Sequence, residues 1–415
     1  MENCANLNNL PTEIIERILS LFTHDMGDLK AAQIALPRHA RIAFSIAQST
    51  KSIIVRGPDA VRQCDELLAA IDQHAQANST TGPILHSPIR FLNIKFYCQP
   101  DQSHALAASF STLISRNKLP ALQDVTLYVK EALDDGKSCQ DNLMTDLGPH
   151  IRTDYDALMN AIDARGRSQN PAKPTNLRIK LEGCGRRNIT TLLQSKPNIN
   201  IKGVSVNLDG SRWSIETKDL LQQLSYAHNT LTDLTITNAP QGWHSKQEAD
   251  FSKLTALLSL RVPAGVWFEH AALGRVGPRH GFVWMTPNSR PSIRAFLPPS
   301  LQELRVDFIC FSRIFVTGPG YQDKLCSHVV HNTASLAKLQ TVYEWMTELV
   351  DPDTGLKKLK RLQVMEGPMM EETRVLAWSP PADLLNAFQT AGVEFELRIR
   401  TWASSSGARG HLPAD

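Results

Sequence analysis

The apolar positions of the chain fall into two patterns that alternate along its length. Short runs have apolar residues at the spacing Leu-x-x-Leu-x-Leu, whose last part has the period of two that is typical of a half-buried strand. These runs cover 122–127, 201–206, 231–236, 254–260, 301–306 and 359–364, with weaker relatives at 89–97, 177–181 and 393–399. Helical periodicity occupies 105–115, 155–164, 218–227, 335–349 and 382–390. Strands that alternate with helices predict an α/β fold.

The repetition of one strand and one helix resembles the leucine-rich-repeat family, whose β/α units stack into a solenoid. A single unit cannot cover its own apolar face, whereas stacking continues each leucine row into the next unit. Third motif positions at 206, 236, 260, 306 and 364 give gaps of 30, 24, 46 and 58 residues. The fourth motif has one extra residue, and the two long gaps contain either insertions or a missed strand. A doubly wound sheet is the alternative that the same alternation allows.

The first strong pattern of the chain is a helical one, over residues 10–22. Its apolar residues recur every three or four positions, Pro11 suits a first helical position, and Glu13 lies near the positive end of the helix dipole. Two further short helices are expected at 29–36 and 38–49, followed by an extended exit at 52–55. The pattern by itself allows a plain helical cap on the following domain.

The segment Leu10-Pro11-x-Glu13-Ile14, with Ile18-Leu19-Ser20-x-Phe22 after it, resembles the opening of an F-box. The resemblance implies that a three-helix unit over residues 10–55 docks on the Skp-type adaptor of a cullin-based SCF ubiquitin ligase. It also implies the residues that would contact the adaptor: Leu10, Pro11, Glu13, Ile14, Ile18, Leu19, Leu21 and Phe22. F-boxes followed by irregular leucine-rich repeats form a familiar architecture, especially in fungi.

Composition and charge narrow the function further. With 44 Lys and Arg against 41 Asp and Glu, the formal net charge is +3, which excludes a strongly basic nucleic-acid binder. Seven widely spaced cysteines without a Cys-x-x-Cys suit a reducing compartment. The N-terminal residues do not resemble a signal peptide, and no apolar run approaches a membrane span. We expect a cytoplasmic or nuclear protein without nucleic-acid or membrane partners.

Catalytic signatures are weak throughout the sequence. No phosphate-binding loop, nucleophile elbow or His-Glu-x-x-His is present, and we expect no cofactor, no metal and no enzymatic activity. Cys326, His328 and His331 have ligand-like spacing but lack a fourth ligand. The run Asp351 to Gly355 begins like a calcium loop, but its glycine and its twelfth position do not fit. The basic run 357–361 is interpreted as lysines that alternate outward around buried leucines.

The stretch 265–297 is the strongest candidate for recognising a target. It lies in the first long gap and combines tryptophan with arginine, the residue types that concentrate binding energy at interfaces. The tentative target-binding residues are Arg275, Arg279, Trp284, Arg290 and Arg294. For Trp267 and Phe268, which follow a strand directly, packing as a satellite core is favoured.

Together these patterns predict an N-terminal three-helix F-box followed by an irregular leucine-rich-repeat-like β/α solenoid. The predicted segments are a flexible start at 1–9, the F-box at 10–55, the solenoid at 56–402 and a disordered tail at 403–415. The expected function is a substrate-recognition adaptor that binds the Skp-type subunit and an unidentified protein target. The alternatives are a scaffold outside any ligase, and an enzyme built on a degenerate α/β fold from residues dispersed in the sequence.

Overall fold

The computed structural model of the 415-residue chain divides it into two compact units. Unit 1 is Met1–Asn207 with Trp213–Ile215, and unit 2 is Leu208–Arg212 with Glu216–Asp415. The residues that the structure describes are 50–55, 62–63, 65–72, 89–98, 107–114, 119, 121–131, 149–167, 175–182, 189–190, 192–194, 196–207, 217–237, 249–267, 270–272, 282–284, 292–308, 342–366, 373–376 and 380–402.

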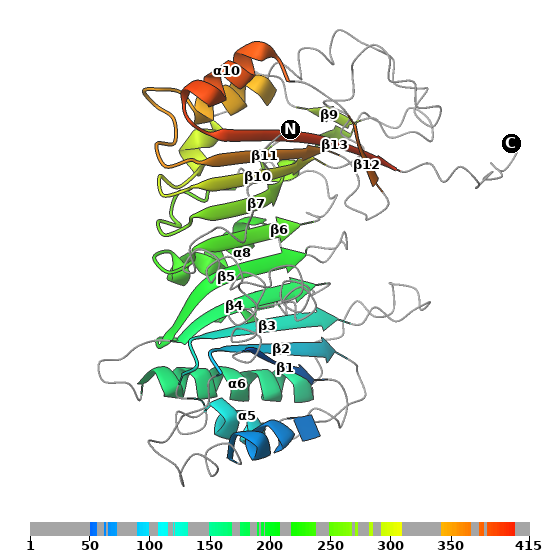
Figure 1. Ribbon diagram of the computed structural model, residues 1–415, viewed down its shortest axis with the longest axis vertical. Coiled ribbons are helices and arrows are strands. Elements are labelled where there is room, and N and C mark those ends of the chain that lie inside the picture. Colours follow the sequence, from blue (N-terminus) through cyan, green and yellow to red (C-terminus); the bar gives the residue numbers. More distant parts are fainter. Residues whose placement is uncertain are drawn as a thin grey trace, which may run out of the picture. The chain divides into compact units, whose positions relative to one another are not determined.

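Unit 1 is a parallel sheet with helices between its strands, which confirms the predicted α/β class (Figure 1). Its strands pair in the order β1-β2-β3-β4-β5, and each of these pairs is parallel. They span Thr50–Val55 (β1), Phe91–Cys98 (β2), Asp124–Glu131 (β3), Thr175–Glu182 (β4) and Ile199–Asn207 (β5). The helices are α5, Ala107–Ile114, and α6, Pro149–Arg167.

Unit 2 repeats this plan with an antiparallel strand at one edge. Its strands pair in the order β6-β7-β10-β11-β13-β12, and only the pair β12–β13 among them is antiparallel. They span Asp233–Thr237 (β6), Ser259–Pro263 (β7), Glu303–Phe308 (β10), Arg361–Glu366 (β11), Thr373–Leu376 (β12) and Glu394–Trp402 (β13). A separate hairpin joins β8, His270–Ala272, to β9, Phe282–Trp284.

The described helical elements of unit 2 lie near the predicted positions, except for the 3-10 turns at 264–266 and 293–296, which were not predicted. They are α8, Thr217–Gln223, with the 3-10 turn η3, Leu224–Ala227; η4, Ala264–Val266; η6, Ile293–Phe296; and α10, Ala382–Thr390. Residues 342–349 are also helical and correspond to the described part of the helix expected at 335–349. The bounds of α10 agree with the prediction at both ends.

The parallel strands of each unit follow one another in chain order. A doubly wound sheet would reverse this order at a switch point, and neither run of parallel strands contains such a reversal. The two long sequence gaps are therefore insertions between neighbouring strands. Strand β10 pairs directly with β7 on one side and with β11 on the other, which leaves no place for a missed strand between them.

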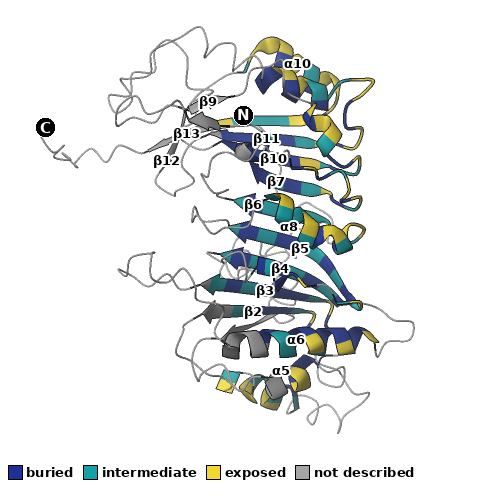
Figure 2. Cartoon of the chain, turned by 180° about the vertical axis from the view of Figure 1, so that it is seen from behind, coloured by how far each residue is buried: buried dark blue, intermediate teal, exposed yellow. Residues whose placement is uncertain are grey.

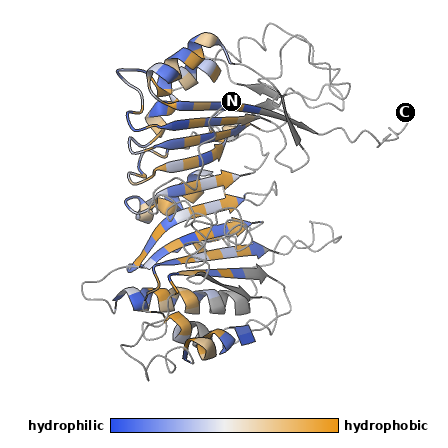
Figure 3. Ribbon diagram, in the orientation of Figure 1, coloured by the Kyte–Doolittle hydropathy of each residue, from blue (hydrophilic) through white to orange (hydrophobic). Residues whose placement is uncertain are grey.

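Continuous apolar rows connect neighbouring strands within each unit. In unit 1, Leu92 faces Val125, which faces Leu177, and a second row continues through Ile94 and Leu127. In unit 2 the corresponding row comprises Leu234, Leu260, Leu304, Leu362 and Phe395. These residues are buried, apart from partly exposed Phe395, and apolar and polar positions alternate along the strands (Figures 2 and 3).

A tight turn precedes several of the strands and contains the first leucine of the motif. The amide of Leu122 donates to the carbonyl of Leu119, and that of Leu301 to the carbonyl of Pro298, both at 3.1 Å. Both lead-ins contain proline in the sequence, and proline favours such turns. The strands begin two residues later, at Asp124 and Glu303, than the motif suggested.

The fourth motif has an extra residue because it was started at Leu254, which lies three residues before the first leucine of this repeat. The amide of Leu257 donates to the carbonyl of Leu254 at 2.9 Å, so Leu257 occupies the place that Leu301 has in the β10 repeat. The strand register pairs Leu260 with Leu304 and Val262 with Val306. The repeat is therefore Leu257-x-x-Leu260-x-Val262, with the same length as the others.

Helix α6 is longer than the helix expected at 155–164, because it continues through Arg167. Tertiary contacts stabilise this last turn. The guanidinium of buried Arg165 donates to the carbonyl of Ile114, the last residue of α5, at 3.2 Å, and to that of Leu122 at 3.1 Å. Gly166 lies so close to Asn198 that an added Cβ would be 2.4 Å from its carbonyl oxygen.

Three of the predicted segments lie outside the described residues. These are the flexible start at 1–9, the three-helix segment at 10–49 and the tail at 403–415, whereas the extended exit at 52–55 is part of strand β1. Among the helices that the structure describes, none has the length and apolarity that crossing a bilayer would require.

We predict that Gly166→Ala lowers the free energy of unfolding, although alanine is the better helix former. The helix would gain about 1 kcal/mol, but the new methyl group meets backbone atoms of Asn198 that cannot move aside. Urea denaturation compared with Ala164→Ser, at an exposed position two residues earlier, measures the effect. A Gly166→Ala protein as stable as the wild type would contradict this close approach.

Candidate functional site

The candidate site is the side of the parallel strands opposite the leucine rows, which we call the polar face of each unit. Side chains alternate along a strand, so the residue between two buried leucines points to this face. In unit 2 one cross-strand row of the face consists of Thr235, Arg261, Arg305, Gln363 and Glu396. In unit 1 two rows begin with Asn93 and Lys95, and the second continues through Tyr128 and Lys180.

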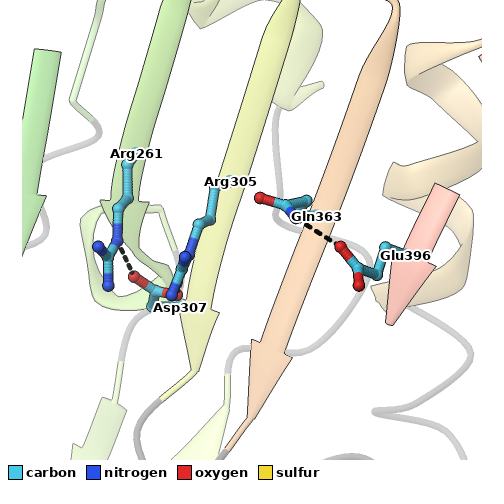
Figure 4. A network of polar contacts seen from close by, with 5 residues as sticks. All are labelled: Arg261, Arg305, Asp307, Gln363 and Glu396. Atoms are coloured by element: carbon cyan, nitrogen blue, oxygen red, sulfur yellow. Dashed lines mark hydrogen bonds and ion pairs between the residues drawn. The ribbon is translucent and has the colours of Figure 1, made fainter. Parts of the chain in front are cut away.

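A buried carboxylate organises the polar face of unit 2. Asp307, with a side chain only 4% exposed, accepts from Nε of Arg261 at 2.6 Å and from Nε of Arg305 at 2.9 Å (Figure 4). Arg261 lies on β7 and Arg305 on β10, so one carboxylate connects two strands. Charge-assisted bonds of this kind are about twice as strong as neutral ones.

A second acidic group occupies the same face on the other side of β11. Glu396 accepts from the side-chain amide of Gln363 (Figure 4). It also pairs with Arg361 at 3.2 Å and with Arg398. Burial raises the pKa of Glu396, but the bonds from Gln363 and the two arginines outweigh burial and hold this pKa below its ordinary value. Each of these arginines thus has a carboxylate partner within the unit.

One ion pair of the same type is present on the polar face of unit 1. The ammonium group of Lys130 on β3 is 2.8 Å from the carboxylate of Glu182 on β4, and the Tyr128 hydroxyl donates to the same carboxylate. Burial raises the pKa of Glu182, and the hydrogen bonds from Lys130 and Tyr128 lower it below the ordinary value. This carboxylate is therefore ionised at neutral pH.

Lys95 and Lys180 form a contrasting, uncompensated pair. They flank Tyr128 in one cross-strand row, since Lys95 is in register with Tyr128 and Tyr128 with Lys180. No ion pair or hydrogen bond joins either ammonium group to another residue within the described part of the chain. Burial, followed by repulsion from Arg178 and Lys95, lowers the pKa of Lys180.

A β-bulge places Arg178 beside this pair. The register shifts between Leu177 and Arg178, so that Arg178 lies opposite Gly203 and Lys202 is the extra residue of β5. An added Cβ on Gly203 would be 2.9 Å from the Arg178 guanidinium and 3.3 Å from its side-chain stem. The absence of a side chain at Gly203 thus leaves room for Arg178 across the strand.

Asp124 is the acidic group closest to the start of these strands. Burial raises its pKa above the ordinary value, even though a hydrogen bond with Asn176 and the charges of Arg178 and Lys202 act in the opposite direction. The charges that lower its pKa are those of Arg178 and Lys202, and Asp124 lies four residues before Tyr128 on β3, about 13 Å along the strand from the row of the two lysines. Asp124 therefore does not balance the two lysines.

The residues predicted to bind a target are only partly described. Arg275, Arg279 and Arg290 lie outside the described residues, Trp284 ends β9 without a described side chain, and Arg294 is exposed on η6. That these five residues form a target-binding site therefore stays a prediction. All eight predicted adaptor-binding residues, from Leu10 to Phe22, also lie outside the described ranges.

The alternative interpretation of Trp267 as a satellite core is confirmed. Its side chain is 7% exposed, its indole Nε1 donates to the carbonyl of Ala249 at 3.1 Å, and its ring packs edge-on against Phe251 with centroids 5.8 Å apart. The neighbouring Phe268 lies outside the described residues. Trp267 therefore stabilises unit 2 from inside.

The candidate metal motifs of the sequence have two different outcomes. Cys326, His328 and His331 are not among the described residues, and in the described part no three metal-ligating side chains converge. The Asp351 carboxylate binds within its own turn, accepting from the amides of Asp353 at 3.0 Å and Thr354 at 2.7 Å and from the Thr354 hydroxyl. These bonds, with those of Thr354 first, lower the pKa of Asp351.

The polar faces were missed in the sequence, although a signal for them was present. The residue between the second and third leucines of each motif points to the polar face, and in unit 2 it is Arg261, Arg305 or Gln363. Comparison of this one position across the repeats would have revealed the charged row. The basic run 357–361 did not belong to it: Lys357, Lys358 and Lys360 are exposed before β11, and Leu359 between them is buried.

No protein-family model and no curated protein matches this chain.

We predict that Asp307→Asn lowers the free energy of unfolding by about 3 kcal/mol, because two partly buried arginines then lack their shared anion. Glu394→Gln, in an exposed pair with Arg361, is the matched control and should cost less than about 0.5 kcal/mol. Urea denaturation followed by tryptophan fluorescence measures both. Equal losses for the two variants would contradict the special role of Asp307.

We also predict opposite effects for two lysines on the polar face of unit 1. Lys130→Met loses its ion pair with Glu182 and should be destabilised by up to about 1 kcal/mol, after allowance for solvent screening. Lys180→Met removes a repelled charge and should raise the stability at neutral pH. Because the folded-state pKa of Lys180 is lowered, this gain should disappear as the pH rises through that pKa. Urea titrations from pH 7 to pH 10 test the pair, and a destabilised Lys180→Met protein would refute the repulsion.

Proposed function

We propose that the chain is a substrate-recognition adaptor of an SCF-type ubiquitin ligase. In this proposal residues 10–55 form an F-box that docks on a Skp-type adaptor and thereby on a cullin, and the rest of the chain is an irregular leucine-rich-repeat-like solenoid. The polar faces bind a protein target. The chain itself performs no chemistry and raises the effective concentration of its target near the ligase.

The observation that carries the proposal is the strand order within each unit. Parallel strands in chain order, connected by unbroken leucine rows and entered in several cases through the same turn, are what stacked β/α repeats require. Such stacking leaves one broad face of the strands without leucines, and here that face holds rows of charged residues. A broad charged face supports protein binding better than it supports an enclosed catalytic site.

The part of the proposal that concerns residues 10–55 depends on the sequence. The apolar stripe at Leu10, Ile14 and Ile18, with Pro11 at the first helical position, has the spacing of an F-box opening. Buried apolar anchors of this kind contribute most of the affinity at protein interfaces. We therefore assign adaptor binding to this stripe and target binding to the strands.

We predict that the full chain co-purifies with the Skp-type adaptor and that Leu10→Ala/Pro11→Ala/Ile14→Ala abolishes this co-purification. The matched control is Thr12→Ala/Glu16→Ala/Arg17→Ala, which changes polar positions of the same helix and should retain binding. Circular dichroism and urea denaturation first establish that both variants keep the fold. Adding the cullin to the purified pair tests whether the complete ligase core assembles.

The outcomes separate the proposal from its alternatives. Binding by the wild type and the polar variant, with loss in the apolar variant, supports the F-box. If the wild type does not bind the adaptor, residues 10–55 are a helical cap and the ligase proposal is refuted. Adaptor binding without cullin recruitment would favour a scaffold outside the ligase.

A further inference from the structure

We propose that Lys95 and Lys180 on the polar face of unit 1 bind an acidic, extended segment of a protein partner through its carboxylates. The inference rests on the proposed function, because it names the class of target that one polar face would accept. It requires only that unit 1 folds as described, so its test is independent of the F-box.

The strand register places two lysines on either side of a tyrosine. Lys95 is on β2, Tyr128 on β3 and Lys180 on β4, in one register row. Neighbouring strands are about 4.8 Å apart, so the two lysine backbones are separated by about 10 Å. The Tyr128 hydroxyl donates to Glu182, so it is already engaged within the unit.

Within the described residues, the charge balance of the face leaves these two lysines without a paired carboxylate. Strands β2 to β4 direct four cations, Lys95, Lys130, Arg178 and Lys180, to the polar face, against two carboxylates, Asp124 and Glu182. Glu182 is bound by Lys130 and Tyr128, and Asp124 interacts with Asn176, Arg178 and Lys202. Keeping half-buried like charges together is unfavourable unless an external anion compensates them.

Unit 2 shows that such compensation is available within the fold. There Asp307 pairs with both Arg261 and Arg305, which lie in one cross-strand row, and Glu396 pairs with Arg361. Unit 1 has a hydrogen-bonding tyrosine where a carboxylate could have stood between its lysines. The missing anion is thus a specific difference between two otherwise similar faces.

An extended acidic chain fits this arrangement better than a single phosphate group. Two lysines on strands about 10 Å apart contact two separate anions more easily than one dianion. Alternate side chains of an extended segment lie on one side, about 7 Å apart. Because glutamate and lysine side chains are both long and flexible, two glutamates at this interval can reach both lysines, each of which acts as a point charge.

The test measures binding of a fluorescein-labelled dodecapeptide, in which glutamate alternates with serine, to the full chain by fluorescence anisotropy. The same peptide with glutamine in place of glutamate is the uncharged control. Lys95→Gln/Lys180→Gln is compared with Lys358→Gln/Lys360→Gln, which removes the same charge from exposed positions in unit 2. We expect about a tenfold loss of affinity for the first variant only, and weaker binding of the wild type at higher salt.

Three results would overturn the inference: equal losses in both double variants, no preference for the glutamate peptide over the glutamine peptide, or tighter binding of a competing polyanion. The competitors are a thymidine oligonucleotide of the same net charge and a peptide with one phosphoserine in place of the glutamates. Adaptor co-purification is measured on the same preparations. If the adaptor binds and the acidic peptide does not, this inference fails alone, and if the peptide binds and the adaptor does not, only the ligase proposal fails.

Discussion

The structure depends on one constraint, namely that the apolar side of each strand is covered only if the next strand continues the row in register. A parallel strand of five to nine residues offers two or three large apolar side chains, and in isolation it would leave them half exposed. Pairing in chain order covers these side chains locally, because each strand pairs with the strand that precedes it in the sequence. Each such side chain that is buried contributes about 1.5–3 kcal/mol relative to its exposed state. A slip of one residue would expose a complete row, so the register is strongly specified.

The same constraint determines the chemistry of the opposite side. Since side chains alternate, every residue between two row leucines is brought to within about 5 Å of its counterparts on the neighbouring strands. Charges that are distant in sequence therefore have to be compatible in space. In unit 2 the sequence meets this requirement with carboxylates that connect two strands, as Asp307 does between Arg261 and Arg305. In unit 1 the requirement is met at Glu182 and left open between Lys95 and Lys180.

Much of the fold could be predicted from the sequence because the determining signal is local. The leucine spacing identified the strands, and the helical period identified α10 to the residue. The strand starts were misplaced by about one turn because the first leucine of each motif serves the preceding turn, as Leu122 and Leu301 show. The end of α6 was missed because buried Arg165 and the contact of Gly166 with Asn198 extend a helix that composition alone would end earlier.

The candidate site was less accessible to sequence reasoning because it depends on register. Neither Lys95 nor Lys180 belongs to a recognisable motif, and their relation becomes visible only when β2, β3 and β4 are aligned. The β-bulge at Lys202 and Gly203 is likewise a property of two paired strands. By contrast, the packing of Trp267 could be anticipated, since its position directly after a buried strand favours burial.

The direct pairing of β10 with both β7 and β11 has a consequence for how such a chain can diversify. The ends of these connections are held in place by the ladder, whatever length of chain joins them. Closing a longer loop is inexpensive, about 0.6 kcal/mol for each doubling of its length. The connections after Pro263 and Phe308 can therefore change in length at little thermodynamic cost, provided that buried residues such as Trp267 and Trp345 are kept. A sheet that repeats the same apolar row can thus remain the same while the sequences of the connections beside it change.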